Sequence, residues 1–186
     1  MDASEDSDDV LAMRAGRGDR LAASRLIARH SPRVLAICVR MMGDRASGED
    51  AAQETFMKLW RSVGRWRPGA AKFETWLYRV ASNACIDRLR QRRPETAVED
   101  APEIADETPL ADHGLMADER RRAVETAIAA LPERQRLAIV LCHYQEMSNV
   151  EAAAVMEVSV EALESLLSRA RKSLKECLAP MRAALA

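Results

Sequence analysis

The sequence predicts an all-α protein in which two small helical domains are joined by a flexible acidic linker. Apolar residues recur at helical spacing almost everywhere, and β-branched runs with period-two alternation are absent. A long acidic segment that contains several prolines interrupts this pattern near the middle of the chain. With 186 residues, the protein is long enough for one medium domain or two small ones.

The first domain is expected to occupy residues 1–93 and to begin with helices. Helical spacing covers residues 8–16 and runs from about residue 20 into the thirties. Pro32 predicts a kink or an early turn there, because proline has no N–H to donate. Gly43 is expected to end this part of the chain, and the next helix is expected to be capped near Ser47.

A loop and a long helix complete the first domain. Gly64, Pro68 and Gly69 break regular structure, so residues 64–72 are expected to form a loop. The spacing then predicts a helix from Thr75 to about Arg92.

The linker is expected at residues 94–118. It is rich in carboxylates, and no Lys or Arg appears before Arg120. Such a composition buries too little apolar surface to fold alone, which favours a solvated tether. The alternative is that its negative charge mimics nucleic acid and shields a basic surface until a partner displaces it.

The second domain, residues 119–186, has the order of elements typical of a helix-turn-helix. Two amphipathic helices are expected first, over 117–131 and 132–145, with Pro132 in a first turn. Ser148 and Glu151 match a capping box, and Ser159 is placed to cap the last helix. A short helix, a tight turn and a longer basic helix then follow. A plain helical hairpin would have a similar sequence.

Several classes of protein are disfavoured. The acidic start is unlike a signal peptide, and the apolar runs are too short to cross a bilayer, so we expect a cytoplasmic protein without membrane insertion. The four cysteines are widely spaced and are expected to be buried or idle thiols. Cys142 and His143 lack a second ligand pair at a zinc spacing, so neither a metal site nor a cofactor is expected. A helical enzyme is disfavoured because no nucleophile elbow or phosphate loop is present.

The long helix that starts at Thr75 carries a candidate nucleic-acid surface. At 100° per residue, five side chains fall within about 80° of one another: Trp76, Arg79, Asn83, Asp87 and Arg90. The opposing side, expected to pack on the preceding helices, holds Leu77, Val80, Ala81, Ala84 and Cys85. An aromatic plane, an amide and guanidinium groups suit unpaired bases and their phosphates. The alternative is that Phe73, Trp76 and Tyr78 are core residues and that the arginines form a solvated helix end. The upstream loop favours the nucleic-acid surface, because it places Trp66, Arg67 and Lys72 beside the same face.

The last helix is amphipathic in a comparable way. One side is apolar, with Val160, Leu163, Leu167, Ala170 and Leu174. The other side is polar, with Glu161, Ser165, Ser168, Arg169 and Lys172. A recognition helix in a major groove needs such an outer face. The formal net charge of -1 argues only weakly against DNA binding, because the acidic residues are concentrated at the start and in the linker.

Three segments together resemble the bacterial group IV, extracytoplasmic-function (ECF) sigma factors. They are DAAQETFMKLW, FETWLYRVASNACIDRLRQRR and LPERQRLAIVLCHYQEMSNVEAAAVMEVSVEALESLLSRAR. The resemblance implies a non-enzymatic initiation factor that binds core RNA polymerase and promoter DNA and is held inactive by an anti-sigma factor. The flexible linker would let the two domains close around the anti-sigma factor and open on the polymerase. The alternative is a stand-alone helix-turn-helix regulator, which would leave the arginine-rich first domain without a role.

The resemblance also implies roles for individual residues of the first domain. The residues expected to dock on the polymerase clamp helices are Asp50, Gln53, Glu54 and Phe56; the alternative is that Phe56 is core and the carboxylates are solvated. The residues expected to hold the minus-ten element and a flipped base are Lys72, Phe73, Trp76, Arg79, Asn83, Arg88 and Arg90. Stacking returns about 1–3 kcal/mol per base, which can offset the cost of unstacking.

The second domain is expected to read the minus-thirty-five element. The candidate contacts are Glu164, Ser165, Ser168, Arg169, Arg171 and Lys172. Here the chain departs from a common family pattern: it has EALESLLSRAR where many relatives resemble GTVKSRLHRAR. Glu164 replaces a basic residue and Leu166 replaces an arginine. Because glutamate repels phosphates but accepts a hydrogen bond from cytosine, an altered element is expected.

Overall fold

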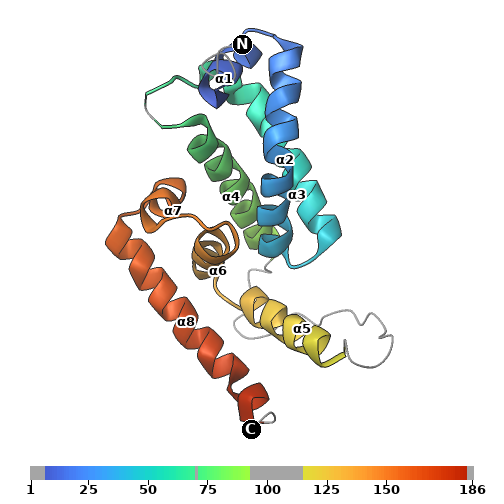
Figure 1. Cartoon of the computed structure of the whole chain (residues 1–186), viewed down its shortest axis with the longest axis vertical. Coiled ribbons are helices and arrows are strands. Elements are labelled where there is room, and N and C mark those ends of the chain that lie inside the picture. The colour runs from blue at the N-terminus through green and yellow to red at the C-terminus, as the bar shows by residue number, and fades with distance from the viewer. Residues whose placement is uncertain (1–6, 70, 93–114, 184–186) are drawn as a thin grey trace.

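The computed structural model of the protein describes residues 7–69, 71–92 and 115–183, and these contain helices and turns but no strand (Figure 1). Most of the predicted acidic linker lies outside the described residues. The first helix of the second domain begins at Leu115, four residues before the predicted domain boundary. Within the described ranges, no helix is long and apolar enough to cross a membrane.

In the described part of the first domain, four α-helices form a bundle. These are α1 (Asp8–Gly16), α2 (Arg20–Met42), α3 (Arg45–Ser62) and α4 (Phe73–Arg92), with a short 3-10 turn, η1 (Val63–Arg65), after α3. Each helix contributes fully buried apolar side chains to one core, such as Leu11, Ile37, Leu59 and Leu77. Burial of these stripes is the main source of stability for the bundle.

Helix ends in this domain follow local chemistry, with two departures from the sequence prediction. Gly43 adopts φ 83° and ends α2 as predicted. The predicted cap at Ser47 is wrong, because the Asp44 side chain caps α3 by accepting from Ser47 N at 2.7 Å. The predicted early turn at Pro32 is also absent, since α2 continues through it to Met42. Pro32 and Ala28 are both exposed, so water can satisfy the Ala28 carbonyl that loses its donor.

Gly48 sets the distance between α2 and α3. A Cβ at this buried position would lie 2.5 Å from Val39 Cα and 2.8 Å from Val39 N. The two backbones can therefore approach this closely only with glycine at Gly48.

The second domain contains the predicted helix-turn-helix. Its helices are α5 (Leu115–Ala129), α6 (Glu133–Ile139), α7 (Asn149–Met156) and α8 (Val160–Ala183), with a π-helical turn, η2 (Val140–Tyr144), directly after α6. The capping box is confirmed, with Ser148 N donating to Glu151 Oε2 at 2.9 Å and Glu151 N donating to Ser148 Oγ at 3.3 Å. The Ser159 cap is confirmed as well, because its hydroxyl accepts from Ala162 N at 3.2 Å.

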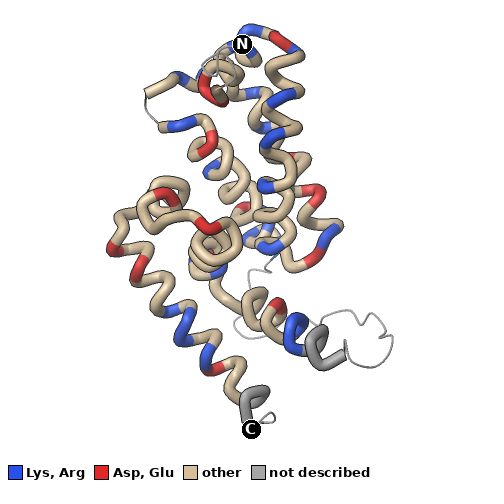
Figure 2. Tube along the Cα trace, in the orientation of Figure 1, with Lys and Arg blue, Asp and Glu red and all other residues tan. Residues whose placement is uncertain are grey.

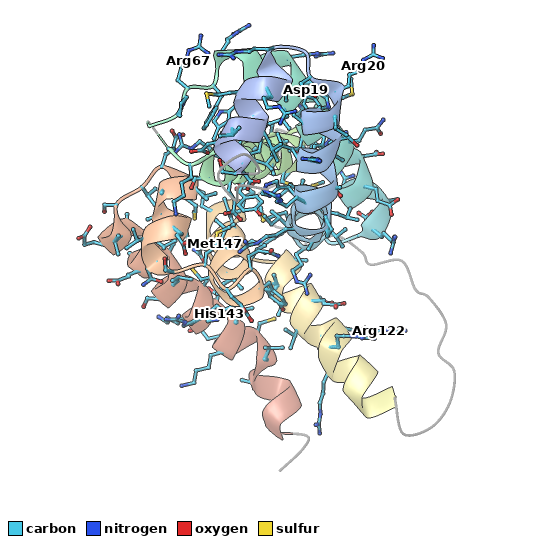
Figure 3. The ribbon with its side chains drawn as sticks, turned by 45° about the horizontal axis from the view of Figure 1, so that its top comes forward. Asp19, Arg20, Arg67, Arg122, His143 and Met147 are labelled. Atoms are coloured by element: carbon cyan, nitrogen blue, oxygen red, sulfur yellow. The ribbon has the colours of Figure 1, made fainter. Side chains whose placement is uncertain are left out.

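The two domains are in direct contact. Figure 1 shows α6 and α7 against α4 of the first domain, while α5 and α8 extend away from it. Arg136 of α6 joins the domains from a buried position, donating to Met41 O at 2.7 Å and also to the carbonyl of Ala129. Met147 lies near this junction, whereas Asp19, Arg20 and Arg67 lie at the far end of the first domain (Figure 3).

Candidate nucleic-acid interfaces

Helix α4 is fixed in the bundle by its apolar side and by its first turn. Leu77, Ala81, Ala84 and Cys85 are buried, as predicted, while Val80 is only partly buried. The orphan amide of Phe73 donates to Asp9 Oδ1 of α1 at 3.0 Å, which anchors the start of the helix. The opposite side of α4 is therefore held in a defined direction.

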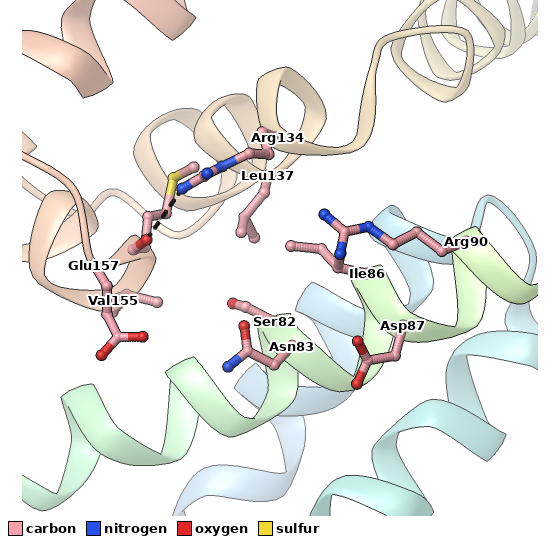
Figure 4. Close-up of a pocket in the computed structure, with 10 residues that line it drawn as sticks. Ser82, Asn83, Ile86, Asp87, Arg90, Arg134, Leu137, Val155 and Glu157 are labelled. Carbon is pink, nitrogen blue, oxygen red and sulfur yellow. Dashed lines mark hydrogen bonds between the residues drawn. The ribbon is translucent and has the colours of Figure 1, made fainter.

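This opposite side, the outer face of α4, consists of Trp76, Arg79, Asn83, Asp87 and Arg90. It lies across from α6 and α7 and helps to enclose a cavity of about 320 Å³ (Figure 4). The cavity is lined by Ser82, Asn83, Ile86, Asp87, Arg90, Arg134, Leu137, Val155, Met156 and Glu157. Asn83 and Arg90 are exposed, Lys72 is exposed just before the helix, and Trp76 is half-buried against the core. The structure thus brings most of the predicted minus-ten residues to one side of the domain.

The side chain of Arg79 is hydrogen-bonded to the second domain. Its guanidinium donates to Glu157 Oε1 at 2.7 Å and to Ala154 O at 2.9 Å. Arg33 of α2 makes a second connection, donating to Gln145 O at 2.6 Å. Arg33 is itself oriented by Glu74 Oε1, 2.9 Å away. Sequence patterns gave no indication that Arg79 pairs with Glu157 or Arg33 with Gln145, because each pair joins two domains.

Phe73 belongs to the core and not to the surface. Its side chain is fully buried, with ring centroids 5.8 Å from Trp66 and 5.9 Å from His30. Tyr78 is buried as well and donates to Glu74 Oε1 at 2.9 Å, and burial raises the pKa of its hydroxyl. For Phe73 and Tyr78, the structure therefore agrees with the alternative that the sequence left open. The spacing of Phe73, Leu77 and Ala81, four residues apart, was a signal for this core stripe.

Arg88 lies on a different side of α4 from Arg79 and Asn83. Its guanidinium reaches back to α3, 2.8 Å from Glu54 Oε2 and 3.6 Å from Asp50 Oδ2. Hydrogen bonds from Arg88 and Lys58 hold the pKa of the Glu54 carboxyl below its usual value. Arg88 therefore joins the residues predicted to dock on polymerase, and is separate from the other predicted minus-ten residues.

Of the predicted docking residues, Asp50, Gln53 and Glu54 form one strip along α3, and Phe56 lies beside it. Asp50 and Gln53 are exposed, Glu54 is half-buried, and Phe56 is half-buried against the core. Met57 adds an apolar side chain, 48% exposed, that sequence reasoning missed. Its position three and four residues after Glu54 and Gln53 was the available signal. The strip combines carboxylates with exposed apolar surface.

The second candidate surface is the outer side of α8, which changes character along its length. Glu161 and Glu164 lie in its first two turns, and Arg169, Arg171, Lys172 and Lys175 follow (Figure 2). Ser168 and all of these charged residues are exposed, and Ser165 is half-buried. Arg169 donates to Ser165 Oγ at 2.9 Å, while Leu163, Leu167 and Ala170 are buried beneath. The basic half suits phosphates, whereas the acidic start does not.

No group of three or more His, Cys, Asp or Glu side chains in the described part of the chain is placed to hold a metal ion. Cys142 is partly buried, and burial raises the pKa of its thiol. The neighbouring His143 projects to the side of α8, where its Nε2 is 3.4 Å from Arg171 Nη2.

Known proteins share both halves of this architecture. Residues 26–95 match the family model described as Sigma-70 region 2, and residues 121–174 match Sigma-70, region 4. The RNA polymerase sigma-H factor of Pseudomonas aeruginosa is 33% identical over 95% of this chain and 96% of its own length. The ECF RNA polymerase sigma-E factor of Escherichia coli K12 is 32% identical over 94% of this chain and 96% of its own. The protein belongs to the ECF sigma factors.

The α1–α4 bundle of this ECF sigma factor therefore contains region 2, and its helix-turn-helix belongs to region 4, as the sequence resemblance indicated. A solved structure of CnrH in complex with the cytosolic domain of CnrY is similar, with a TM-score of 0.68 and 29% identity over 93% of this chain and 97% of that chain. The sigma factor RpoE of Bartonella quintana, solved with the anti-sigma factor NepR, shares the fold at a TM-score of 0.61 and 22% identity over 83% of this chain and 95% of that chain. A stand-alone helix-turn-helix regulator is not favoured, because region 2 accounts for the first domain.

Proposed function

We propose that this ECF sigma factor binds core RNA polymerase through the exposed strip of α3 and reads promoter DNA with α4 and α8. The observation that carries the proposal is that two sides of α4 carry different sets of side chains. Its Arg88 side belongs with the carboxylates of α3, and its outer face carries Trp76, Asn83 and Arg90. One helix can therefore lie between polymerase and DNA, which a factor that opens promoters requires.

The outer face of α4 suits a single strand better than a duplex. Asn83 offers an amide for the edge of an unpaired base, and Trp76 offers part of an aromatic plane. Arg79, Arg90 and Lys72 are spaced along about five helical turns of chain and can follow the phosphates of that strand. On this proposal the protein itself catalyses no reaction and acts in the cytoplasm, where it initiates transcription of a signal-dependent set of genes.

A protein partner is the second part of the proposal. Two solved relatives were captured with another protein bound, in one case an anti-sigma factor. The cavity between α4 and α6–α7 has apolar walls from Ile86, Leu137 and Val155 beside charged side chains, which is the chemistry of an amphipathic helix-binding groove. We propose that an anti-sigma factor binds here and keeps the domains together.

The test is transcription in vitro with core polymerase, this protein as the only added factor, and a library of promoters randomised around minus ten. The expected result is selective transcription, reduced about 5- to 100-fold by Trp76→Ala or Asn83→Ala, since a stacked base or a contact to a base edge is worth about 1–3 kcal/mol. Arg90→Ala should also reduce it, and Arg20→Ala is the matched control, because Arg20 lies at the far end of the first domain (Figure 3). Duplex binding without any transcription would overturn the proposal.

A further inference from the structure

The negative charge of Glu164 is not explained by its position within α8. It lies beyond the first helical turn, where the helix dipole no longer favours a negative charge. Glu161, three residues earlier on the same side, adds like-charge repulsion. By contrast, the position of Glu161 is explained by the helix start, since hydrogen bonds from its own backbone amide and from Ser159 lower the pKa of its carboxyl.

Glu164 is nevertheless held in place. Asn149, the first residue of α7, donates from Nδ2 to Glu164 Oε1 at 3.3 Å, so the two helices of the helix-turn-helix are joined at this point. In the described part of the chain, Glu164 makes no ion pair. The Glu164 side chain is exposed, and among the described residues its second carboxylate oxygen accepts no hydrogen bond, so this oxygen is available to a donor outside the protein.

The charge distribution along α8 indicates where that donor lies. A recognition helix meets base edges with its N-terminal residues, and the basic residues of α8 begin only at Arg169. The acidic start therefore cannot lie on phosphates, while the later turns can. Of the groups on base edges in a major groove, only the exocyclic amines of cytosine and adenine donate hydrogen bonds, and a carboxylate is the acceptor suited to cytosine.

We propose that Glu164, positioned by Asn149, selects cytosine at one position of the minus-thirty-five element. This inference rests on the proposed sigma function and deepens it, because it assigns one base preference to one side chain. Arg169 lies on the adjacent part of the same outer side, where it donates one hydrogen bond to Ser165. Its remaining donors can bind a guanine or a phosphate.

The experiment uses holoenzyme made from core polymerase and the full chain, on promoters with a fixed minus-ten element and a randomised minus-thirty-five region. Transcripts are counted for each template by sequencing. The wild type should favour one cytosine about 5- to 100-fold over other bases. Glu164→Gln should move that preference to adenine, which an amide pairs with through N6 and N7, and Glu164→Ala should abolish the preference at that position only.

Two further variants separate recognition from structure. Glu161→Gln removes the same charge one turn earlier and should leave the cytosine preference assigned to Glu164 unchanged. Asn149→Ala should weaken the cytosine preference without changing its identity, which a purely stabilising role of Asn149 would not do.

Other outcomes are equally informative. If Glu164→Gln and Glu164→Ala raise transcription from all minus-thirty-five sequences alike, Glu164 only repels phosphates and the inference fails. It also fails if no base preference changes in either variant. If the wild type transcribes no template, the proposed sigma function itself fails, so the two failures are distinguishable.

Discussion

Arg88 connects α4 to the carboxylates of α3 through one side chain. It bridges to Glu54 and Asp50, and Lys58 contacts Glu54 from the same helix as these carboxylates. The low pKa of Glu54 means that the folded state binds its proton more weakly than the unfolded chain does. The associated stability is therefore present above the ordinary glutamate pKa and is lost as the pH falls through the lower, folded value.

Replacing Arg88 should therefore destabilise the protein in a pH-dependent way. For Arg88→Ala we expect a loss of about 0.5–1 kcal/mol in the free energy of unfolding near pH 7, kept small because the pair is partly solvated. The difference from wild type should shrink as the pH falls below 4.5, the ordinary pKa of a glutamate, because Glu54 becomes protonated in the variant first. Urea denaturation at several pH values measures it. Arg90→Ala, an exposed arginine on the same helix, serves as the control and should show no such pH dependence.

Phe73 provides a second test at the scale of a residue. Because its ring is fully buried among Trp66, His30 and Trp76, Phe73→Ala should cost about 3–5 kcal/mol in the free energy of unfolding. The exposed neighbour Lys72→Ala should cost almost nothing. Chemical denaturation followed by tryptophan fluorescence compares them. A small loss of stability in Phe73→Ala together with a large loss of promoter opening would instead restore the predicted DNA role of Phe73.

At the scale of elements, the packing of α2 on α3 depends on Gly48. Alanine is the better helix former by up to about 1 kcal/mol, but here its Cβ would collide with the backbone of Val39. We expect the collision to dominate, so that Gly48→Ala lowers the free energy of unfolding by about 1–3 kcal/mol. Gly64→Ala is the matched control, because the nearest atom to its added Cβ is Gly16 O at an ordinary 3.5 Å. Equal stability of the two variants, measured by thermal unfolding, would contradict this account.

Elements with a local cause were predictable from the sequence. The capping box at Ser148 and the helix end at Gly43 each depend on residues within one turn of each other, and both are confirmed. Prediction was weaker where two local choices compete, as for Asp44 and Ser47, which both can cap a helix. The π-helical turn after α6 was not predicted, since it reflects a bond from Gln145 N to Val140 O that composition does not encode.

For the candidate interfaces, the sequence predicted which side chains share one face of a helix but not what those side chains contact. Helical geometry correctly grouped Arg79, Asn83 and Arg90 on the side of α4 opposite its buried stripe, because spacing along one helix fixes direction. It did not reveal that Arg88 turns toward α3, which depends on where another helix packs. Nor did it reveal Glu157 as the partner of Arg79, because the two are 78 residues apart in the chain.

At the scale of the whole molecule, the second domain covers part of the surface proposed for the minus-ten strand. Arg79 cannot contact a phosphate while it is paired with Glu157, and the cavity beside Asn83 is enclosed by α6 and α7. Across the contact, guanidinium groups of Arg33, Arg79 and Arg136 donate hydrogen bonds to the other domain, and buried apolar residues of both domains belong to one continuous cluster. Promoter binding on the proposed function therefore requires the domains to separate.

Weakening this contact should strengthen binding to single-stranded DNA. In the full chain, Glu157→Gln keeps the side-chain size but removes the charge that pairs with Arg79. Because Glu157 is mostly exposed and Arg79 keeps some contact with solvent, we expect affinity for a single-stranded minus-ten oligonucleotide to rise only about 2- to 5-fold. Fluorescence anisotropy at a fixed salt concentration measures the affinity. Loss of a negative charge by itself also strengthens binding to DNA, whether or not Arg79 is released.

The control must therefore carry the same change in net charge. Glu146→Gln alters an exposed glutamate near the same domain contact, and no interdomain hydrogen bond of its side chain is seen among the described residues. It should raise affinity less than Glu157→Gln does. In an Arg79→Ala background, Glu157→Gln should add no more than Glu146→Gln, because the group it releases is gone. Equal effects of both glutamine variants in both backgrounds would mean that net charge, and not release of Arg79, governs access to the minus-ten surface.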